Sequence, residues 1–508
     1  MKQPVLFETI PCDKLQILDK DELVTLTGIH LDIIRQLQDE VKRLANFADK
    51  TGEQTLLLNG QYIVLKEKIF GRSSEKSKGK KISKKMNKDR KKRVLLPSER
   101  YPNIPLKDQE IVFKYAPNCF CCGKSMRDMG LTEDSEHLTV VPAKYEIIRQ
   151  RRHKYSCGYC HGLILTAPVP PRIKPGSSYS DEILIDASMS KYCDLIPMER
   201  YAAIAERAGL PGLPPHSLIE GSHYLADFTK DAYERLKAET CEAWELKADE
   251  TPHRLLELNK KGYLWGFSTD KACYFEIHST RAGEVASGFL KESKCRFLLT
   301  DAYSGYAKAV REANEYRKEK GFPLIKNIYC NAHCRRRFSE ASLVFKDEAK
   351  FFIRCYEKIY RLENKNLEDK SFPLTKIRKW QKIYFRLMKR KALNLELNFS
   401  TKSLMGKAMN YLLKNYKELT LFMEHNLSIE NNGQERLLRN PVIGRKTWYG
   451  TQSIRGARTA SILFSLVESC KLNKVNPREY FKELVSDLHQ GKACFTPAEF
   501  KLRLSQDG

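Results

Sequence analysis

The order of strand-like and helix-like segments in residues 241–337 restricts the fold of this chain more than any other feature. Three short strand-like segments come first, separated from one another by turn residues. A helical segment, a fully apolar strand, a second helical segment and a fifth strand follow. Residues 338–428 are almost wholly helical and separate this core from the last part of the chain. The pattern predicts a mixed α/β domain of order β-β-β-α-β-α-β with a helical insertion.

Three acidic residues occupy informative places in this pattern. The order is that of a ribonuclease H-like fold, in which the first and fourth strands are neighbours. Asp249 caps the first strand and Asp301 caps the fourth, so we expect the two side chains to meet at adjacent strand ends. Glu435 opens a helical segment after the insertion. Three convergent carboxylates can hold two Mg²⁺ or Mn²⁺ ions, and two such ions can cut and join phosphodiester bonds.

Each of these acidic residues also has a simpler interpretation. A lone Asp at a strand end commonly caps a turn. Asn432 followed three residues later by Glu435 matches a capping box, which would stabilise a helix and do no chemistry. Glu430, five residues before Glu435, is the other candidate for the third metal ligand. A carboxylate early in a helix, such as Glu435, can project toward aspartates carried on strands, but both glutamates stay open at this point.

Composition indicates the class of partner. Lys and Arg number 89 against 63 Asp and Glu, which leaves a net charge of +26 over 508 residues. This excess favours nucleic acid as the first partner and an anionic membrane as the second, with a generally solvated basic surface as the alternative. The length predicts roughly three or four domains.

The compartment follows from what the sequence lacks. There is no apolar run of about 18 residues and no signal-peptide core at the N-terminus. The 15 cysteines are odd in number and scattered, as in a reduced cytosolic protein. We therefore expect a cytoplasmic protein without a membrane partner.

The N-terminal third divides into a helical region and a basic linker. Apolar residues spaced by three and four predict a coiled coil, or an amphipathic helix on its own domain. These residues are Ile34, Leu37, Val41 and Leu44. Eleven of the eighteen residues from Lys76 to Arg93 are Lys or Arg, which indicates either nucleic-acid contact or a solvated linker.

Two cysteine pairs predict a zinc module. The four ligands of this CxxC…CxxC pattern are Cys119, Cys122, Cys157 and Cys160. Each CxxC pair can supply two ligands, so the two pairs complete a tetrahedral zinc site. Cys121 and His161 are possible substitute ligands. The alternative is that the cysteines are buried thiols that bind no metal. Four basic residues precede the second cysteine pair and suit DNA contact: Arg149, Arg151, Arg152 and Lys154. The alternative is that the zinc only stabilises a small domain.

A weaker metal pattern lies at the end of the fifth predicted strand, "LIKNIYCNAHC" (324–334). Cys330 and His333 are spaced as metal ligands, but no second pair is evident, and a role in packing or DNA positioning is the alternative. Further basic residues suited to phosphate contacts are Arg335, Arg336, Arg337, Arg436, Arg445 and Lys446. The predicted segments are 1–70 (helical or coiled coil), 71–108 (basic linker), 109–168 (zinc-binding), 169–240 (helical, DNA-binding), 241–337 (core), 338–428 (insertion) and 429–508 (catalytic helix and basic tail).

The motifs together resemble the transposases of the insertion-sequence 66 family, a DDE-type group of bacterial mobile elements. The resembling segments are "LKEKIFGRSSEK" (65–76), "CFCCGK" through "YSCGYC", "SKYCDLIPMERYAAIAERAGLP" (190–211), "ADETPHR", "TDAYSGY", "CNAHCRRRF" and "ENNGQERLLRNPVIGRKTWYG". The sequence departs from the family pattern at Glu430, where Asp is more usual, at the "GQ" before Glu435, and in "GTQSIRGARTA" (450–460).

The resemblance implies a catalytic triad of Asp249, Asp301 and Glu435, and zinc ligation by the four cysteines. It also implies cleavage and strand transfer at terminal inverted repeats, a homodimer or larger assembly, two small accessory proteins as partners, and a bacterial cytoplasm in which the DNA-bound protein associates with the nucleoid. Two other functions stay open: a zinc-dependent nucleic-acid-binding regulator with an inactive core, and a ribonuclease H-like nuclease without strand transfer.

Overall fold

The computed structural model describes residues 34, 37, 38, 58–66, 96–102, 105–108, 121, 124, 125, 135, 136, 138, 144–156, 164–368 and 373–506. Residues 1–73, 169–201 and 214–508 form one compact unit, and residues 74–168 and 202–213 form a second. No helix in the described part of the chain has the length and apolar composition that crossing a membrane requires.

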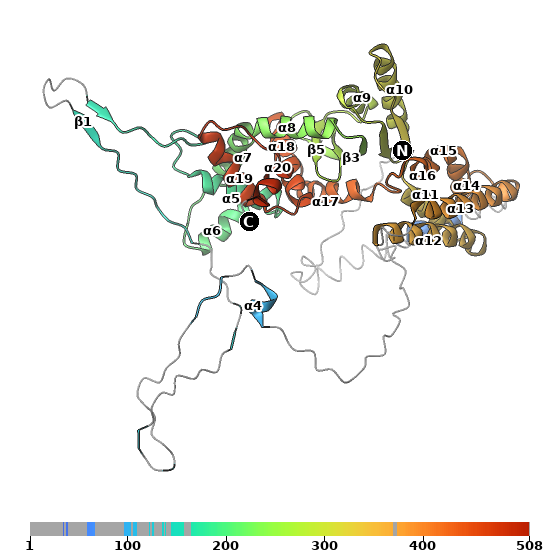
Figure 1. Cartoon of the computed structure of the whole chain (residues 1–508), viewed down its shortest axis with the longest axis horizontal. Helices are drawn as coiled ribbons and strands as arrows, with labels where there is room; N and C mark the ends of the chain where they lie inside the picture. Colours follow the sequence, from blue (N-terminus) through green and yellow to red (C-terminus); the bar gives the residue numbers. More distant parts are fainter. Residues whose placement is uncertain are drawn as a thin grey trace. The chain divides into compact units, whose positions relative to one another are not determined.

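The first unit is built around a five-stranded sheet (Figure 1). Its strands are β3 (Glu245–Leu255), β4 (Lys260–Ser268), β5 (Cys273–His278), β6 (Phe297–Thr300) and β7 (Lys326–Tyr329). Their spatial order is β5-β4-β3-β6-β7, antiparallel from β5 to β3 and parallel from β3 to β7. Helices α9 (Gly283–Glu292) and α10 (Ser304–Glu319) connect the strands in the predicted order. The first and fourth strands of the core are therefore neighbours.

Two boundaries differ from the prediction. Asp249 does not end its strand, because β3 continues to Leu255 as the partner of the long strand β4. The fifth strand ends at Tyr329, so Cys330 and His333 lie at the start of a helix and not on a strand. In both cases the strand stops where the register with its partner ends, at Leu255 opposite Lys260 and at Tyr329 opposite Thr300.

Strand β6 is buried on both faces, as its apolar composition predicts. Leu298 belongs to the core formed with α9 and α10. Phe297 and Leu299 belong to a second core, formed with the helical insertion. Because successive side chains of a strand point to opposite faces, one four-residue strand joins the two cores.

A row of serines on α18 (Ile454–Leu472) covers the edge strand β5. The serine hydroxyl oxygens accept hydrogen bonds from every second backbone N–H of β5: Cys273 to Ser469 (2.9 Å), Phe275 to Ser465 (2.8 Å) and Ile277 to Ser461 (3.1 Å). We call this row the serine ladder. Because an edge strand otherwise presents unpaired N–H groups, the ladder closes this side of the sheet.

Three helices that precede the sheet in this unit share its core. They are α5 (Asp181–Tyr192), α7 (Pro215–Phe228) and α8 (Lys230–Cys241). Of α6 (Met198–Arg207), residues 202–207 belong to the second unit. Leu184, Leu225 and Leu236 are buried in the same cluster as Phe267 of β4 and Phe464 of α18. Residues 181–201 and 214–241, predicted as part of a DNA-binding region, therefore also support the sheet. The C-terminal helices α19 (Pro477–His489) and α20 (Pro497–Leu504) complete this side.

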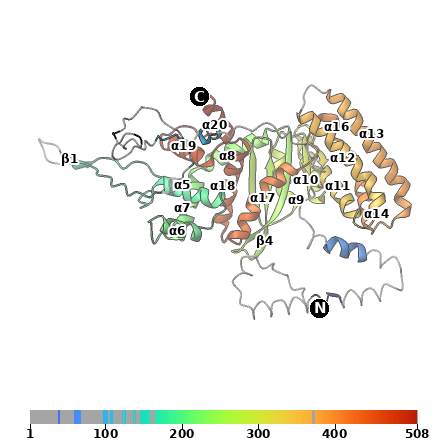
Figure 2. The ribbon, with the colours of Figure 1, turned by 90° about the horizontal axis from the view of Figure 1, so that it is seen from below.

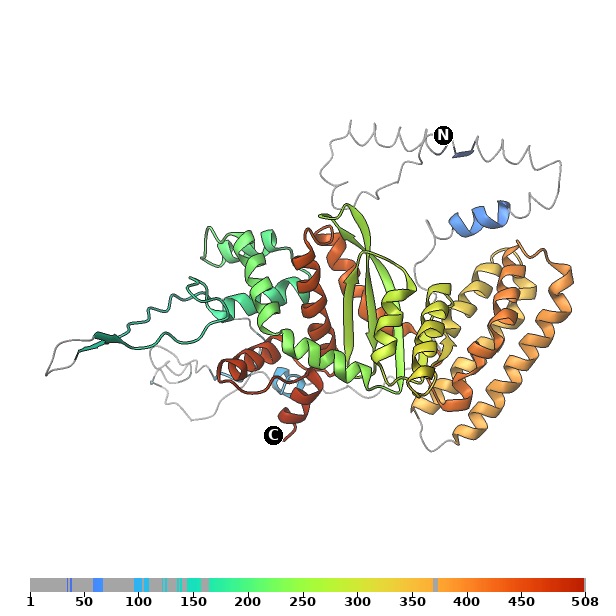
Figure 3. The same cartoon turned by 90° about the horizontal axis from the view of Figure 1, so that it is seen from above.

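The predicted insertion is helical and has its own core. It contains α11 (Asn331–Ala341), α12 (Lys346–Glu368), α13 (Leu374–Leu395), a short 3-10 turn (Glu396–Asn398), α14 (Leu404–Lys414), α15 (Tyr416–Thr420) and α16 (Phe422–His425). Figure 2 shows α18 along one side of the sheet and the insertion beyond the other. Figure 3 shows the same division from the opposite direction. Helix α17 (Asn432–Thr447) returns from the insertion to pack on β3 and β4.

The second unit contains α4 (Pro97–Arg100) and an antiparallel pair, β1 (Lys154–Ser156) and β2 (Ile164–Thr166). The predicted zinc ligands Cys119, Cys122, Cys157 and Cys160, and the substitute His161, lie outside the described residues. The basic segment 76–93 does as well. Of the predicted coiled-coil seam, Ile34 and Leu37 are helical and exposed, whereas Val41 and Leu44 lie outside the described residues.

Candidate active site

Three carboxylates converge where β3 and β6 separate. The last paired residues of these strands are Lys247 and Leu299, so continuing the register by two residues places Asp249 opposite Asp301. Glu435 lies in the first turn of α17. Burial, together with repulsion from Glu250, Asp301 and Glu435, raises the pKa of Asp249 to about 8. The structure therefore brings together the three predicted acidic residues from three different elements.

Backbone groups orient the two aspartates. The amide of Glu250 donates to Asp249 Oδ1 at 2.9 Å, and the amide of Tyr303 donates to Asp301 Oδ1 at 3.0 Å. These bonds use one carboxylate oxygen of each aspartate and leave Oδ2 to bind another group. This division suits a metal ligand, because one oxygen fixes the side chain while the other can bind the ion.

Glu250 lies next to Asp249 in sequence but makes different contacts. Its side chain is only 2% exposed and accepts hydrogen bonds from Arg281 Nε (2.8 Å), Arg281 Nη2 (2.6 Å) and the Tyr306 hydroxyl (2.6 Å). The Arg281 guanidinium also lies over the Tyr303 ring, 4.1 Å from its centroid. Arg281 therefore neutralises the charge of Glu250, and the hydrogen bonds of Glu250 fix the part of β3 next to Asp249.

The third acidic position is occupied by Glu435 and not by Glu430. Glu435 contributes to the raised pKa of Asp249, whereas Glu430 lies near Tyr360 of the insertion, where burial and then the Glu430 charge raise the pKa of the Tyr360 hydroxyl. The capping-box interpretation of Glu435 is wrong. The helix begins at Asn432 with Asn431 as its N-cap, so Glu435 is the fourth helical residue and its amide donates to the Asn431 carbonyl at 3.2 Å.

Two buried asparagines hold the segments around the site. Asn431 donates through its amide side chain to the carbonyl of Ala248 at 2.8 Å, and through its backbone to Cys330 Sγ at 3.2 Å. Asn331 donates through its side chain to the Leu419 carbonyl at 2.9 Å. These bonds connect β3, α11 and the end of the insertion. Sequence analysis missed both residues as well as Glu250, although all three lie within motifs that it used.

A glycine allows α17 to approach the sheet. Gly266 of β4 pairs with Asp249 of β3. A Cβ atom at Gly266 would lie 2.1 Å from Gln434 Nε2 and 2.8 Å from the Phe275 ring. Glycine at this position therefore brings the start of α17, and with it Glu435, close to β3. Gln434 is fully buried, and its amide has no hydrogen-bond partner among the described residues.

Cys330 and His333 lie beside the third carboxylate. His333 Nε2 is 3.6 Å from Glu435 Oε1. The ligand atoms of Cys330, His333 and Glu435 all lie within 4.8 Å of one another. Burial lowers the pKa of His333 and raises the pKa of the Cys330 thiol to about 11. At neutral pH this imidazole is therefore neutral and can offer a lone pair.

The predicted DNA-contacting residues occupy several surfaces. In the second unit, Arg149, Arg151, Arg152 and Lys154 are all exposed. In the first, Arg436 and Lys446 are exposed on α17, whereas Arg445 is half-buried and donates to Thr251 Oγ1 at 3.1 Å. Arg335 and Arg337 of α11 lie over the rings of Tyr360 and Tyr411, and Arg336 is half-buried on the same helix.

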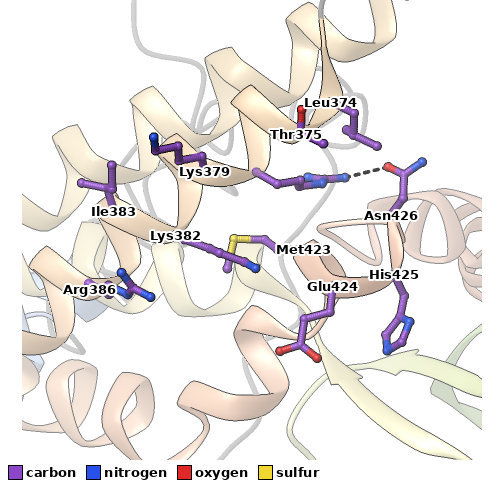
Figure 4. Close-up of a pocket in the computed structure, with 11 residues that line it drawn as sticks. Leu374, Thr375, Lys379, Lys382, Ile383, Arg386, Met423, Glu424, His425 and Asn426 are labelled. Atoms are coloured by element: carbon purple, nitrogen blue, oxygen red, sulfur yellow. Dashed lines mark hydrogen bonds between the residues drawn. The ribbon is translucent and has the colours of Figure 1, made fainter.

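The insertion carries an open basic groove of about 820 Å³. We define the basic groove by the exposed side chains of Lys379, Lys382 and Arg386 on α13. Figure 4 shows these side chains on one wall and Glu424 and His425 on the other. Beneath them, Arg378 is buried and paired with Glu363 at 2.6 Å. The buried Arg378–Glu363 pair therefore fixes the part of α13 that carries the exposed cations. These cations suit an anionic ligand.

Comparison with known proteins gives two family matches. The family described as "Transposase IS66 family" matches residues 176–459, more than half of the chain and the part that contains all three carboxylates. The family described as "zinc-finger binding domain of transposase IS66" matches residues 117–161, which include the four predicted zinc ligands.

Relatives that match about 70–75% of this chain come from Sinorhizobium fredii (strain NBRC 101917 / NGR234). The uncharacterized protein y4jD is 24% identical over 397 residues, which cover 75% of this chain and 76% of the relative. The uncharacterized protein y4hP is 23% identical over 415 residues (74% and 72%), and the uncharacterized protein y4qI is 26% identical over 384 residues (70% and 68%).

Proposed function

Because this chain belongs to the IS66 family of transposases, we propose that it cleaves DNA at the ends of its element and joins them to target DNA. The observation that carries the proposal is the convergence of Asp249, Asp301 and Glu435 from three elements. The strand order β5-β4-β3-β6-β7, with β3 and β6 parallel, supports a ribonuclease H-like catalytic core.

The residues at this site fit divalent metal ions. Burial and then repulsion from the neighbouring carboxylates raise the pKa of Asp249, and a bound cation would neutralise this concentration of negative charge. Glu435 Oε1 is buried and has no hydrogen-bond partner among the described residues. Bound Mg²⁺ or Mn²⁺ would activate water or a DNA 3′-hydroxyl and stabilise the leaving oxygen. Asp249, Asp301 and Glu435 would hold the ions.

The protein's own groups prepare this site before any ion binds. The amides of Glu250 and Tyr303 fix one oxygen of each aspartate. The Glu250–Arg281–Tyr306 network holds β3 against α10 without adding a free charge. Asn431 ties the start of α17 to β3, which keeps Glu435 near the aspartates. Such preorganisation lowers the entropic cost of assembling the ligands.

DNA recognition would combine the zinc-finger domain with basic surfaces. The domain match at 117–161 supports Zn²⁺ bound by Cys119, Cys122, Cys157 and Cys160, beside the exposed Arg149, Arg151, Arg152 and Lys154. Exposed Arg436 supplies a cation next to Glu435, and exposed Lys446 supplies another in the last turn of the same helix, where each can contact phosphate. Joining two element ends would require a homodimer or larger assembly, and small accessory proteins of the element are further candidate partners.

The test uses labelled element ends, a target plasmid and Mg²⁺. Asp249→Asn, Asp301→Asn and Glu435→Gln should each lower cleavage and strand transfer about 100-fold or more, because a lost metal ligand costs more than a lost outer-shell partner. Binding of the ends should persist in all three variants.

Glu430→Gln is the matched control and should keep measurable activity. Near-wild-type cleavage by Asp249→Asn would remove the catalytic assignment. Cleavage without joining by the wild type would favour a nuclease, and end binding without cleavage would favour a regulator with an inactive core.

A further inference from the structure

The carboxylate site does not account for the side chains of Cys330 and His333. Both lie at the N-terminus of α11, with Cys330 as its N-cap and His333 one turn later. Their ligand atoms and that of Glu435 lie within 4.8 Å of one another, and donors around one tetrahedral ion lie about 3.5 Å apart, so an inward shift of about 1 Å would bring them round a single ion. Sulfur, nitrogen and oxygen donors thus meet at one edge of the proposed active site.

The surroundings of these donors favour a cation. Glu435 Oε1 and His333 Nδ1 are buried and have no hydrogen-bond partner among the described residues. Cys330 is fully buried and accepts a hydrogen bond from the amide of Asn431 at 3.2 Å, which stabilises negative charge on sulfur. A metal ion bound here would compensate the carboxylate and deprotonate the thiol.

The donor set determines which ion fits. Mg²⁺ prefers six oxygen ligands and does not select thiolate. Zn²⁺ and Co²⁺ accept cysteine, histidine and carboxylate ligands together, and three protein ligands leave a position for water. A three-ligand site should bind more weakly than the four-cysteine module. It would therefore fill only when such an ion is added.

We propose that Cys330, His333 and Glu435 form a second cation site, selective for Zn²⁺ or a similar ion, which withdraws Glu435 from the carboxylate site. Asp301 also adds its charge to the surroundings of His333, so the two sites are adjacent. Occupation of the second site would inhibit Mg²⁺-dependent chemistry. The inhibition rests on the proposed function, whereas binding of the ion does not.

Binding is tested with Co²⁺ alone. Added to the full-length protein as purified with its zinc, Co²⁺ should produce a thiolate-to-cobalt charge-transfer band. Cys330→Ser should abolish this band, and His333→Gln, at a half-buried position that tolerates a polar side chain, should weaken Co²⁺ binding at least about 10-fold. Cys334→Ala, one turn along the same helix, should keep the band. Equal spectra for wild type and Cys330→Ser, or loss of the band in Cys334→Ala alone, would overturn the site.

Inhibition is tested with Zn²⁺ in the cleavage assay. Each protein is compared with its own activity in Mg²⁺ alone. Wild type and Cys334→Ala should be inhibited, and Cys330→Ser should need at least about 10-fold more Zn²⁺. Equal sensitivity of wild type and Cys330→Ser would overturn the competition for Glu435. A protein without cleavage under any condition would contradict the proposed function, and the cobalt spectra would still decide whether the site exists.

Discussion

At the scale of single residues, Asp249 has an unfavourable electrostatic environment in the protein without metal. Burial and repulsion from Glu250, Asp301 and Glu435 raise its pKa to about 8, against an ordinary value near 3.8. The folded chain therefore holds a proton on Asp249 between about pH 4 and pH 8 that the unfolded chain has released. This contribution makes the protein less stable as pH rises through that window, with the full cost present above the folded pKa.

Replacing Asp249 with Asn should remove this pH-dependent cost. In buffer without Mg²⁺ at pH 8.5, Asp249→Asn should raise the free energy of unfolding by at least about 1 kcal/mol. At about pH 3.5, below the window, the side chain is largely neutral in both the folded and the unfolded chain, so the two proteins should differ little. Urea denaturation at both pH values measures this. Added Mg²⁺ should stabilise the wild type more than the variant, and a difference independent of pH would contradict the argument.

Residue roles were predictable where the local sequence restricts them. Glu435 lies early in a helix, as its position after "ENNGQ" predicts, although the helix is capped by Asn431 and not by Asn432. The contacts of Glu250 were not predictable, because Arg281 and Tyr306 are 31 and 56 residues away along the chain. The local sequence thus identifies the Asp249 carboxylate but not the groups that neutralise the neighbouring Glu250.

At the scale of elements, the serine ladder holds α18 against β5. Each hydroxyl receives a backbone N–H that the sheet leaves unpaired, and α18 is buried from Ala457 to Cys470 except at Arg458. Sequence analysis identified β5 and the helical tail but not their pairing, since the partners are 184 to 196 residues apart. A serine row at helical spacing looks like a polar face until its strand is known.

Removal of the central ladder serine should destabilise the protein. Ser465→Ala leaves the Phe275 amide buried without its acceptor, which costs about 1–3 kcal/mol of unfolding free energy. Ser486→Ala is the matched control, because that serine is exposed on α19. Denaturation of both variants gives the comparison. Equal stability of Ser465→Ala and wild type would mean that water or a neighbour replaces the hydroxyl.

The zinc module should fold only with its metal. A closed thiolate site contributes folding free energy to a small domain. Elemental analysis after dialysis against zinc-free buffer should give about one Zn²⁺ per chain, and Cys119→Ser or Cys157→Ser should lose it. Cys494→Ser, at a half-buried thiol of the first unit, should retain it. A wild-type protein without zinc would refute the four-cysteine assignment.

At the scale of the whole molecule, positive charge is distributed over several surfaces and not gathered in one tail. Composition alone predicted a polyanionic partner from the net charge of +26. It could not predict the basic groove, because the helix that carries Lys379, Lys382 and Arg386 has other basic residues of similar spacing on its other faces. Only tertiary packing determines which of these cations line one groove.

The basic groove should contribute to DNA affinity. The triple variant Lys379→Gln, Lys382→Gln and Arg386→Gln should weaken DNA binding with little dependence on sequence. It should also make the slope of log K against log salt less negative by up to about 2.7, since each neutralised phosphate contributes about 0.9. The matched control replaces the exposed Lys346, Lys350 and Arg354 of α12 with Gln. Equal slopes for the two triple variants would mean that only total charge matters.

The serine ladder joins a helix and a strand whose repeats differ in length. Four residues of helix rise about 6.0 Å, whereas two residues of an antiparallel strand rise about 6.8 Å, so each successive rung falls about 0.8 Å further out of step. Three short hydroxyls span this mismatch. At the next position, four residues after Ser469, the longer side chain of Asn473 reaches the Lys271 carbonyl at 2.6 Å. The contact therefore depends on the exact relative position of the two elements, because a single inserted residue in either one would separate every later serine from its N–H partner.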